Sequence, residues 1–340
     1  MKINMNLGEN SYDIIVERGI ISRAKEELDL NRKVFIITDE LVPEKYAKEV
    51  ASQCKESYII AVKSGEESKS IKVYQSLLSK MLSSGFSRGD CVVAVGGGVV
   101  GDLSGFVAAS YMRGVDFYNI PTTLLSQIDS SIGGKVAVNL DGIKNIVGAF
   151  YQPKKVLIDP DVLKTLPERH LSNGLAEAVK MSLTSDEELF EIFENQDVWE
   201  NIDEIIVKSL TIKKNVVEMD EKEAGLRKIL NFGHSIGHGI EEENEMRSLY
   251  HGECIALGMI PMCSESVRER LINVLNKLSL PVTAQFDADK VIELMKHDKK
   301  VKDGKLSAVF VEKAGSFVMK DVSCESLKSD LALICEGECI

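Results

Sequence analysis

The sequence is poor in the features that mark disordered, membrane-bound and secreted proteins. Only 7 of its 340 residues are proline and 44% are hydrophobic, which is the composition of an ordered globular chain. The longest apolar runs, such as Cys91 to Val95, are far shorter than the roughly 20 residues that a membrane-spanning helix needs. The segment from Met1 to Asn10 alternates polar and apolar residues instead of leading from basic residues into an apolar block, so we expect no secretory signal.

Cysteine and positive charge are also scarce. The 7 cysteines are scattered without a C-x-x-C pair, which favours a reduced, cytoplasmic protein. Lys and Arg number 41 against 53 Asp and Glu, and the net charge of −12 argues against nucleic acid and anionic membranes as partners. Any anionic ligand must therefore be held by local basic residues.

The pattern of the chain changes near residue 160. Before that point, short β-branched runs alternate with amphipathic segments, which is the βαβ pattern of a parallel sheet covered by helices. The predicted strands are 33–38, 57–62, 90–95, 117–120 and 155–158, and the predicted helices lie around 43–53, 70–83 and 100–110.

After Pro160 the periodicity is mostly helical. The predicted helices are 168–183, 186–195, 199–219, 226–242, 252–268 and 287–297, followed by a small strand pair at 306–312 and 316–320. Because proline disfavours a helical residue before it, we place the boundary at Asp159-Pro160. The sequence thus predicts an α/β domain, 1–159, and an all-α domain, 160–340, with the ligand site in the cleft between them.

A glycine-rich motif follows the predicted strand 90–95. Gly96, Gly98 and Gly101 fit G-x-G-x-x-G where a helix is expected to begin, a position that lets phosphate approach backbone amides. The alternative is a tight turn with close strand-to-helix packing. Because the motif follows the third βα unit, Asp39 at the end of an earlier strand is the candidate acid for the ribose, or else only a turn or cap residue.

Histidine is rare and clustered. Of the 5 histidines, His234, His238 and His251 fall within a short stretch. If 226–242 is one helix, Arg227, Asn231, His234 and His238 share a sector of about 60°. Imidazoles four residues apart can share one divalent ion, with His251 reaching it from the next helix; the alternative is a pair of surface histidines. Three glycines within this helix indicate that something packs closely against it.

Two further segments have open interpretations. Glu177 lies among apolar residues with Lys180 one turn later, which is either a carboxylate metal ligand or a solvated pair. The stretch 128–135, followed by Lys144-Asn145, is either a cationic phosphate loop or a hairpin with exposed lysines. The charge runs at 241–245 and 299–302 are interpreted as solvated faces.

Together these segments closely resemble the 3-dehydroquinate synthase family within the sugar-phosphate cyclase superfamily. The matching stretches are GGGVVGDLSGFVAASYMRG at 96–114, PTTLLSQIDSSIGGKVAVN at 121–139, KNIVGAFYQP at 144–153, GLAEAVK at 174–180, GLRKILNFGHSIGH at 225–238 and HGECIALGM at 251–259. They run in the family's order across nearly the whole chain, and this ordered set is far more specific than any single motif.

The resemblance implies an NAD-binding Rossmann-like domain, a helical C-terminal domain and one divalent metal, zinc or cobalt. The implied metal ligands are Glu177, His234 and His251, with His238 supporting them or contacting substrate. The implied nucleotide positions are Asp39, Glu66, Lys69, Gly98, Val99, Val100, Gly101, Asp102, Thr122, Thr123, Lys135 and Lys144. The implied substrate positions are Asp129, Lys135, Asn145, Lys180, Lys213, Arg227, Asn231 and His238, with one of Lys299 and Lys300. Arg113 matches an arginine that reaches a neighbouring subunit's site, which implies a homodimer.

The family's substrate is 3-deoxy-D-arabino-heptulosonate 7-phosphate, a small phosphorylated sugar acid of the shikimate pathway. Its two anionic groups explain a cationic pocket in an acidic protein. The implied reaction is a lyase reaction with transient NAD reduction, phosphate elimination, ring opening and aldol closure. Leu41 and Met181 depart from the family's usual residues. The rival interpretations are another sugar-phosphate cyclase, a metal-dependent polyol dehydrogenase, and a paralogue that only binds.

Overall fold

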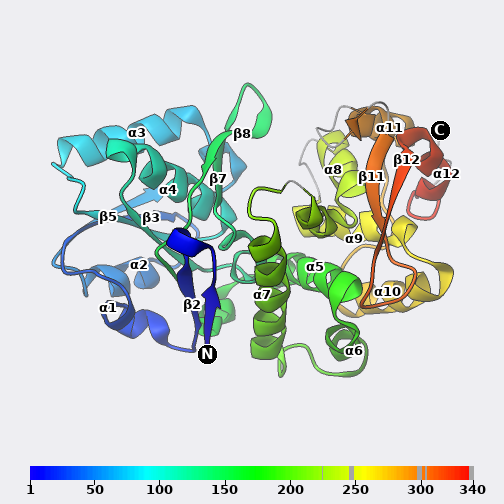
Figure 1. Ribbon diagram of the computed structural model, residues 1–340, viewed down its shortest axis with the longest axis horizontal. Helices are drawn as coiled ribbons and strands as arrows, with labels where there is room; N and C mark the ends of the chain where they lie inside the picture. Colours follow the sequence, from blue (N-terminus) through cyan, green and yellow to red (C-terminus); the bar gives the residue numbers. More distant parts are fainter. Residues whose placement is uncertain (224, 245–248, 297–300, 303–304, 337–340) are drawn as a thin grey trace. The chain divides into compact units, whose positions relative to one another are not determined.

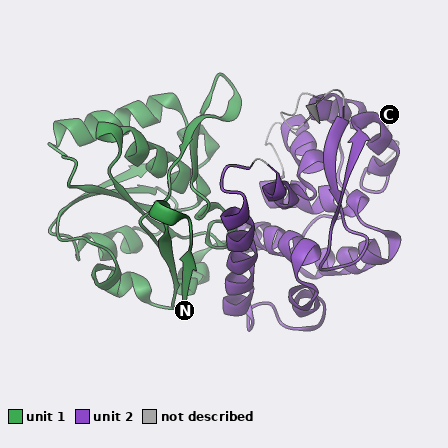
Figure 2. Ribbon diagram, in the orientation of Figure 1, with its two compact units in different colours: residues 1–167 green, residues 168–340 purple. Residues whose placement is uncertain are grey.

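The computed structural model divides into two compact units, Met1–Pro167 (unit 1) and Glu168–Ile340 (unit 2), which Figures 1 and 2 show. The structure describes residues 1–223, 225–244, 249–296, 301–302 and 305–336. The division comes later than the expected boundary at Asp159-Pro160. The 3-10 helix η6 (Pro160–Thr165) belongs to unit 1, because the Asp159 carboxylate accepts the backbone N–H of Gly19 at 2.9 Å and Asp161 pairs with Arg18 at 2.7 Å.

Unit 1, whose residues are all described, is built on a seven-stranded sheet with the order β1-β2-β9-β6-β5-β3-β4. Its strands are β1 (Lys2–Met5), β2 (Tyr12–Val16), β3 (Lys33–Asp39), β4 (Glu56–Val62), β5 (Cys91–Gly96), β6 (Asp116–Pro121) and β9 (Lys155–Ile158). The strands pair in parallel except for the antiparallel β1 and β2. The five predicted strands are confirmed. The sequence analysis missed β1 and β2, which join the sheet through β9, far away along the chain.

Helices cover both faces of this sheet (Figure 1). The helices α3 (Ile71–Ser83) and α4 (Gly98–Ser110) pack on one face, and α2 (Glu44–Ala51) packs on the other with η2 (Ile20–Arg23) and α1 (Ala24–Glu27). In β3, Val34 and Ile36 join one core cluster while Phe35 and Ile37 join the other. Because both faces are buried, the central strands are almost continuously apolar, which is why they are recognisable in the sequence.

The order in which successive strands are added to the sheet reverses between β3 and β5. These strands are neighbours in space, but β4 separates them in sequence, and β6 then continues on the far side of β5. Asp39 ends β3, and the glycine-rich turn follows β5, so both lie at the carboxyl edge of adjacent parallel strands. A crevice outside the carboxyl ends of strands at such a reversal is the usual ligand site of open α/β sheets.

A separate antiparallel hairpin resolves the alternatives left open for residues 128–145. A single π-helical turn, η5 (Ser126–Ser130), leads through Gly133 and Gly134 into β7 (Lys135–Leu140), which pairs with β8 (Ile143–Phe150). The hairpin packs against α4. Lys135, Lys144 and Asn145 therefore belong to a hairpin and not to a continuous loop.

Unit 2 is helical with one small sheet. Its described helices are α5 (Glu168–Ser185), α6 (Glu187–Asn195), α7 (Ile202–Met219), α8 (His234–Glu243), α9 (His251–Met259), α10 (Glu265–Lys277), α11 (Ala288–Lys296) and α12 (Lys328–Leu331). The sheet contains β10 (Val301–Lys302), β11 (Lys305–Phe310) and β12 (Val318–Ser323), so the predicted strand pair is confirmed and extended by one strand. Among the described residues, no helix combines the length and apolar character that crossing a bilayer requires.

Two predicted helices of unit 2 are broken. The expected helix 226–242 consists of a 3-10 helix, η7 (Leu226–Asn231), and α8, separated at Gly233 with φ of +73°. The positive φ departs from helical geometry, and a Cβ at Gly233 would lie 2.7 Å from Met259 Cγ of α9, so both the backbone and the packing favour glycine at the break. The expected helix 252–268 is interrupted after α9 by η8 (Ile260–Met262), which contains Pro261.

Candidate functional site

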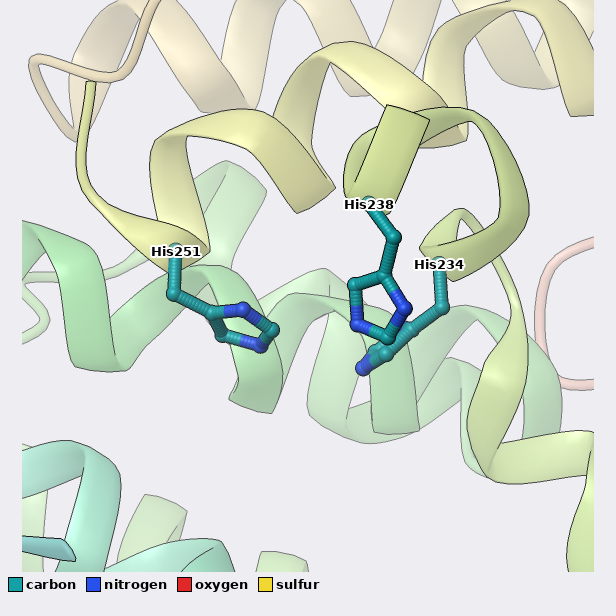
Figure 3. Close-up of side chains that lie close together, drawn as sticks. All are labelled: His234, His238 and His251. Atoms are coloured by element: carbon teal, nitrogen blue, oxygen red, sulfur yellow. The ribbon is translucent and has the colours of Figure 1, made fainter. Parts of the chain in front are cut away.

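Three histidines of unit 2 converge, as Figure 3 shows. His234 begins α8, His238 follows one turn later, and His251 begins α9, which packs against α8. One nitrogen from each ring lies within 4.8 Å of the others, and the ring centroids are 5.2 to 5.7 Å apart. The expected closeness of the three is confirmed, but the helix break makes the predicted 60° sector with Arg227 and Asn231 wrong, because those two residues belong to η7.

Glu177 from α5 lies against this cluster. Its carboxylate is 1% exposed, and Oε1 lies 3.5 Å from Nε2 of His234 and 3.4 Å from Nε2 of His251. Lys180 Nζ contacts Oε2 and is itself 2% exposed, which excludes the solvated pair that the sequence left open. Within the described part of the chain, neither carboxylate oxygen has a hydrogen bond of normal geometry. A buried anionic acceptor of this kind suits a bound cation.

The two imidazoles beside Glu177 are oriented by their other nitrogens. His234 Nδ1 lies 3.0 Å from the carbonyl oxygen of Phe232, and His251 Nδ1 lies 3.0 Å from Oε2 of Glu241. These partners favour a proton on Nδ1, so Nε2, the nitrogen that lies nearer Glu177 in both rings, is the atom that each ring can offer to a metal. A carboxylate or carbonyl behind a metal-binding imidazole is the usual support for such ligands. The donor set therefore fits one divalent metal with nitrogen and oxygen ligands.

The electrostatics agree with this arrangement. Burial alone would raise the pKa of Glu177, but the Lys180 charge and the nearby His251 outweigh it and lower that pKa to about 2. Burial alone would lower the pKa of His251, but the neighbouring carboxylates of Glu177 and Glu241 outweigh it and raise that pKa above its usual range. The cluster thus keeps its carboxylate ionised and concentrates negative charge around His251, which favours positive charge at this point.

The predicted cations of unit 2 are buried. Lys180, Lys213 and Arg227 are 2%, 5% and 3% exposed, on α5, α7 and η7. Arg227 Nη1 donates to the carbonyl oxygen of Glu221 at 2.6 Å, and Asn231 Nδ2 lies 3.4 Å from Oε1 of Glu223. Lys299 and Lys300 lie outside the described residues. Buried cations of this kind are suited to binding anionic groups.

The glycine-rich turn of unit 1 opens directly into α4. The helix begins at Gly98, and none of the described side chains caps its N-terminus. Val99, Val100, Gly101 and Asp102 complete its first turns, and Thr122 N donates to the carbonyl oxygen of Gly96 at 2.9 Å. The first N–H groups of a helix lack intrahelical acceptors and attract anions, so the turn fits a phosphate.

Asp39 has the turn role that the sequence left open. Its Oδ1 accepts the backbone N–H of Leu41 at 2.8 Å and of Val42 at 3.2 Å. Thr123 Oγ1 likewise accepts the N–H of Ser126 at 3.2 Å, after β6. Both residues lie at strand ends on the carboxyl edge of the sheet, where a nucleotide is expected.

Asn139, which was not among the predicted site residues, bonds to residues predicted to bind the nucleotide. Its Nδ2 donates to Glu66 Oε1 at 2.8 Å, and its Oδ1 accepts the N–H of Asn145 at 2.8 Å. Its own N–H donates to the carbonyl oxygen of Lys69 at 2.8 Å, and the Lys69 ammonium is paired with Asp102 of α4. One amide side chain thus connects the 66–69 segment with the hairpin.

The remaining predicted residues of unit 1 lie on η4 (Tyr111–Arg113), on η5 and on the hairpin. Arg113 is exposed on η4 with φ of +69°. Lys135 is exposed at the start of β7, Lys144 lies on β8, and Asp129 lies in η5.

Glu241 was wrongly interpreted as part of a solvated face. Its side chain is 15% exposed and supports His251. The only signal in the sequence was its position one helical turn after His238 in the same predicted helix, which did not separate it from the acidic residues that follow.

Comparisons with known proteins agree over most of the chain. Family models described as 3-dehydroquinate synthase N-terminal and 3-dehydroquinate synthase C-terminal match residues 59–173 and 174–301. A 3-dehydroquinate synthase from Clostridium acetobutylicum is 41% identical, and the match covers 96% of this chain and 98% of that protein.

Solved structures share the fold. A 2-epi-5-epi-valiolone synthase from Streptomyces hygroscopicus with NAD+ and Zn2+ bound has a TM-score of 0.87 and 27% identity, over 96% of this chain and 97% of that one. A 2-deoxy-scyllo-inosose synthase complexed with carbaglucose-6-phosphate, NAD+ and Co2+ has a TM-score of 0.88 over 97% of this chain and 99% of that one. Its identity of 24% supports the likeness of fold alone.

Proposed function

Because the chain belongs to the 3-dehydroquinate synthase family, we propose that it converts 3-deoxy-D-arabino-heptulosonate 7-phosphate into 3-dehydroquinate and phosphate in the shikimate pathway. The observation that carries the proposal is 41% identity to a relative of that name over 96% of the chain. The reaction is a lyase reaction that uses NAD and one divalent metal, zinc or cobalt. When bound, the metal would polarise a substrate hydroxyl, and NAD would take up a hydride and return it.

Glu177, His234 and His251 are the proposed metal ligands. Their support is the buried Oε1 of Glu177 within 3.5 Å of two imidazole nitrogens whose rings are held from behind. His238 carries a nitrogen within 4.8 Å of the other two rings, so it is suited to accept a proton from a substrate hydroxyl held at the cluster.

The remaining residues bind and orient the two organic molecules. Buried Lys180, Lys213 and Arg227 suit the carboxylate and phosphate of the substrate. The proposed substrate contacts are Asp129, Lys135, Asn145, Lys180, Lys213, Arg227, Asn231 and His238. The proposed NAD contacts are Asp39, Glu66, Lys69, Gly98, Val99, Val100, Gly101, Asp102, Thr122, Thr123, Lys135 and Lys144.

We also propose a cytoplasmic homodimer in which Arg113 serves the site of the neighbouring subunit. The support is its exposure at the tip of η4, away from the bonds that hold the other site residues of unit 1. Analytical ultracentrifugation tests the dimer. Mixing an Arg113→Ala chain with a chain inactive at His251 tests the exchange, because hybrid dimers would regain one working site.

The direct test is phosphate release from 3-deoxy-D-arabino-heptulosonate 7-phosphate with catalytic NAD, while NADH absorbance is followed. We expect phosphate release that a chelator stops and added metal restores, without net NADH, and 3-dehydroquinate as the product. NADH rising in step with turnover of a polyol would instead indicate a dehydrogenase. Phosphate release only from a heptulose 7-phosphate without the carboxylate would indicate another cyclase.

A further inference from the structure

A regular set of contacts joins α5 to the first turn of α9. Arg169, Asn173 and Glu177 recur at four-residue intervals along α5 and therefore share one face of that helix. Their partners are three consecutive residues at the start of α9: Arg169 bonds Glu253, Asn173 bonds Gly252, and Glu177 faces His251. Only the last contact belongs to the proposed metal site.

The first contact is a bidentate ion pair between Arg169 and Glu253. Arg169 Nε and Nη2 donate to Oε1 and Oε2 of Glu253 at 2.6 and 2.7 Å, and the Glu253 side chain is 8% exposed. Glu253 Oε2 also accepts the backbone N–H of Tyr250 at 2.8 Å, as in a helix capping box. The Tyr250 ring stacks on His170 with centroids 4.9 Å apart, and the Arg169 guanidinium lies 4.1 Å from its centroid. Glu253 and Tyr250, the residue just before α9, are thereby both tied to α5.

The second contact brings the two backbones together. Gly252 N donates to Asn173 Oδ1 at 2.6 Å, and a Cβ at Gly252 would overlap the backbone oxygen of Asn173. Asn173 is 7% exposed. The start of α9, which as a helix terminus would otherwise fray, is therefore held against α5 within one turn of Glu177.

His251 is the first residue of α9, so its position depends on how that terminus is held. Zinc and cobalt need ligand distances of about 2.0 to 2.2 Å, and shifts of a few tenths of an ångström weaken binding. Glu241 orients the ring of His251, but it does not set the distance of the α9 backbone from α5.

We propose that Arg169, Asn173 and Glu253 form a clasp that positions His251 opposite Glu177, and that these three residues tune metal affinity without touching the metal. This inference rests on the metal site of the proposed function. The clasp acts through the backbone of α9, so Arg169, Asn173 and Glu253 are positioning residues.

The chain offers a matched control for the ion pair. Arg270 of α10 donates from Nε and Nη2 to both carboxylate oxygens of Glu194 on α6, each at 2.7 Å. This pair is also partly buried and also joins two helices of unit 2, but it contacts none of the proposed metal ligands. The variants to compare are Arg169→Gln, Glu253→Gln and Arg270→Gln.

The test measures the dissociation constants for Zn2+ and Co2+ by competition with a chromophoric chelator, the absorption spectrum of the Co2+-loaded protein, and the melting temperature without metal. We expect R169Q and E253Q to weaken metal binding by about 10- to 100-fold and to alter the Co2+ spectrum. R270Q should lower the melting temperature comparably while leaving both metal readouts within about twofold of the original chain, as for an ordinary ion pair.

Unchanged metal affinity in R169Q and E253Q, beside a normal Co2+ spectrum, would overturn the clasp while the proposed function stood. Equal loss of affinity in all three variants would also overturn it, because the effect would then be general destabilisation. Failure of the unaltered chain to bind either metal would refute the metal site and the clasp together. If E253Q does not fold, R169Q decides the matter, since Arg169 is half exposed.

Discussion

The glycine-rich turn of unit 1 and the histidine cluster of unit 2 are built in different ways. The turn is one continuous segment between β5 and α4, and backbone N–H groups supply its binding capacity. The cluster takes single side chains from α5, α8 and α9, and its geometry depends on how those helices pack. A site made of backbone survives most side-chain changes nearby, whereas a site made of distant side chains is sensitive to every contact that holds its helices.

The largest expected effect is confined to the histidine cluster and leaves the glycine-rich turn unaltered. His251→Ala should lower metal affinity by at least about 100-fold and abolish turnover, because one of the three proposed protein ligands is lost. The dissociation constant for NAD should stay the same. Metal content after dialysis measures the retention of metal, and a fluorescence titration with NADH measures the affinity for the nucleotide. A parallel loss of NAD binding would contradict the independence of the sites.

The buried ion pair of unit 1 gives the next largest effect. Lys69→Met should reduce the free energy of unfolding by about 3 kcal/mol, because it leaves the Asp102 carboxylate without its buried partner. Metal affinity in unit 2 should not change. The control is Lys48→Met, which breaks an exposed ion pair with Glu44. It should change the free energy of unfolding in urea by less than about 0.5 kcal/mol. Similar losses in both variants would show that burial is not the cause.

The helix break before the histidine cluster predicts a smaller effect on stability. Gly233 and Gly19 have nearly equal φ angles, +73° and +76°, but only Gly233 has neighbours within 4 Å of an added Cβ. Gly19→Ala should cost about 1 kcal/mol for the backbone alone, and Gly233→Ala about 2 to 3 kcal/mol because α9 must also move. Only the second should weaken metal binding. Equal losses of unfolding free energy in the two variants, measured by chemical denaturation, would show that packing against α9 does not add to the cost at Gly233.

The smallest effect concerns the link between the 66–69 segment and the hairpin. Asn139→Ala removes hydrogen bonds to Glu66 and Asn145 and should raise the KM for NAD about 3- to 10-fold, with metal affinity unchanged. Asn4→Ala is the control, because the Asn4 side chain donates to Asp13 Oδ1 of β2 at 3.0 Å, a bond that involves none of the proposed NAD contacts. An unaltered KM for NAD in both variants would show that Asn139 does not support NAD binding.

Much of the fold was predictable because local patterns express it. The strands β3, β5 and β9 are buried on both faces, so each is a short apolar run, and the amphipathic helices α2, α3 and α6 show their periodicity plainly. β1 and β2 were missed because β1 pairs with β2, and β2 joins the sheet only by pairing with β9, across most of unit 1. The alternation of polar and apolar residues at the start of the chain was visible in the sequence, but the strands that pair with this segment were not.

The candidate site was predictable in its members but not in its construction. His234, His238, His251 and Glu177 could be named from their residue types and from the family resemblance. The break at Gly233 could not, because three glycines within one predicted helix looked alike, and only in the folded chain does Gly233, alone of the three, have a positive φ. Glu241 and Asn139 resemble ordinary surface residues until their partners are seen.

The sequence by itself determined the alternation of strands and helices in the first half, the helical second half, the glycine turn at the end of a buried strand and the set of rare histidines. These features follow from periodicity, composition and residue chemistry, which act over a few neighbouring positions. Only the tertiary structure decided where the helix before His234 breaks, how Glu177 is placed against the imidazoles and which contacts hold His251. Those outcomes depend on the packing of α5, α8 and α9, whose residues are distant in sequence and meet only when the unit is folded.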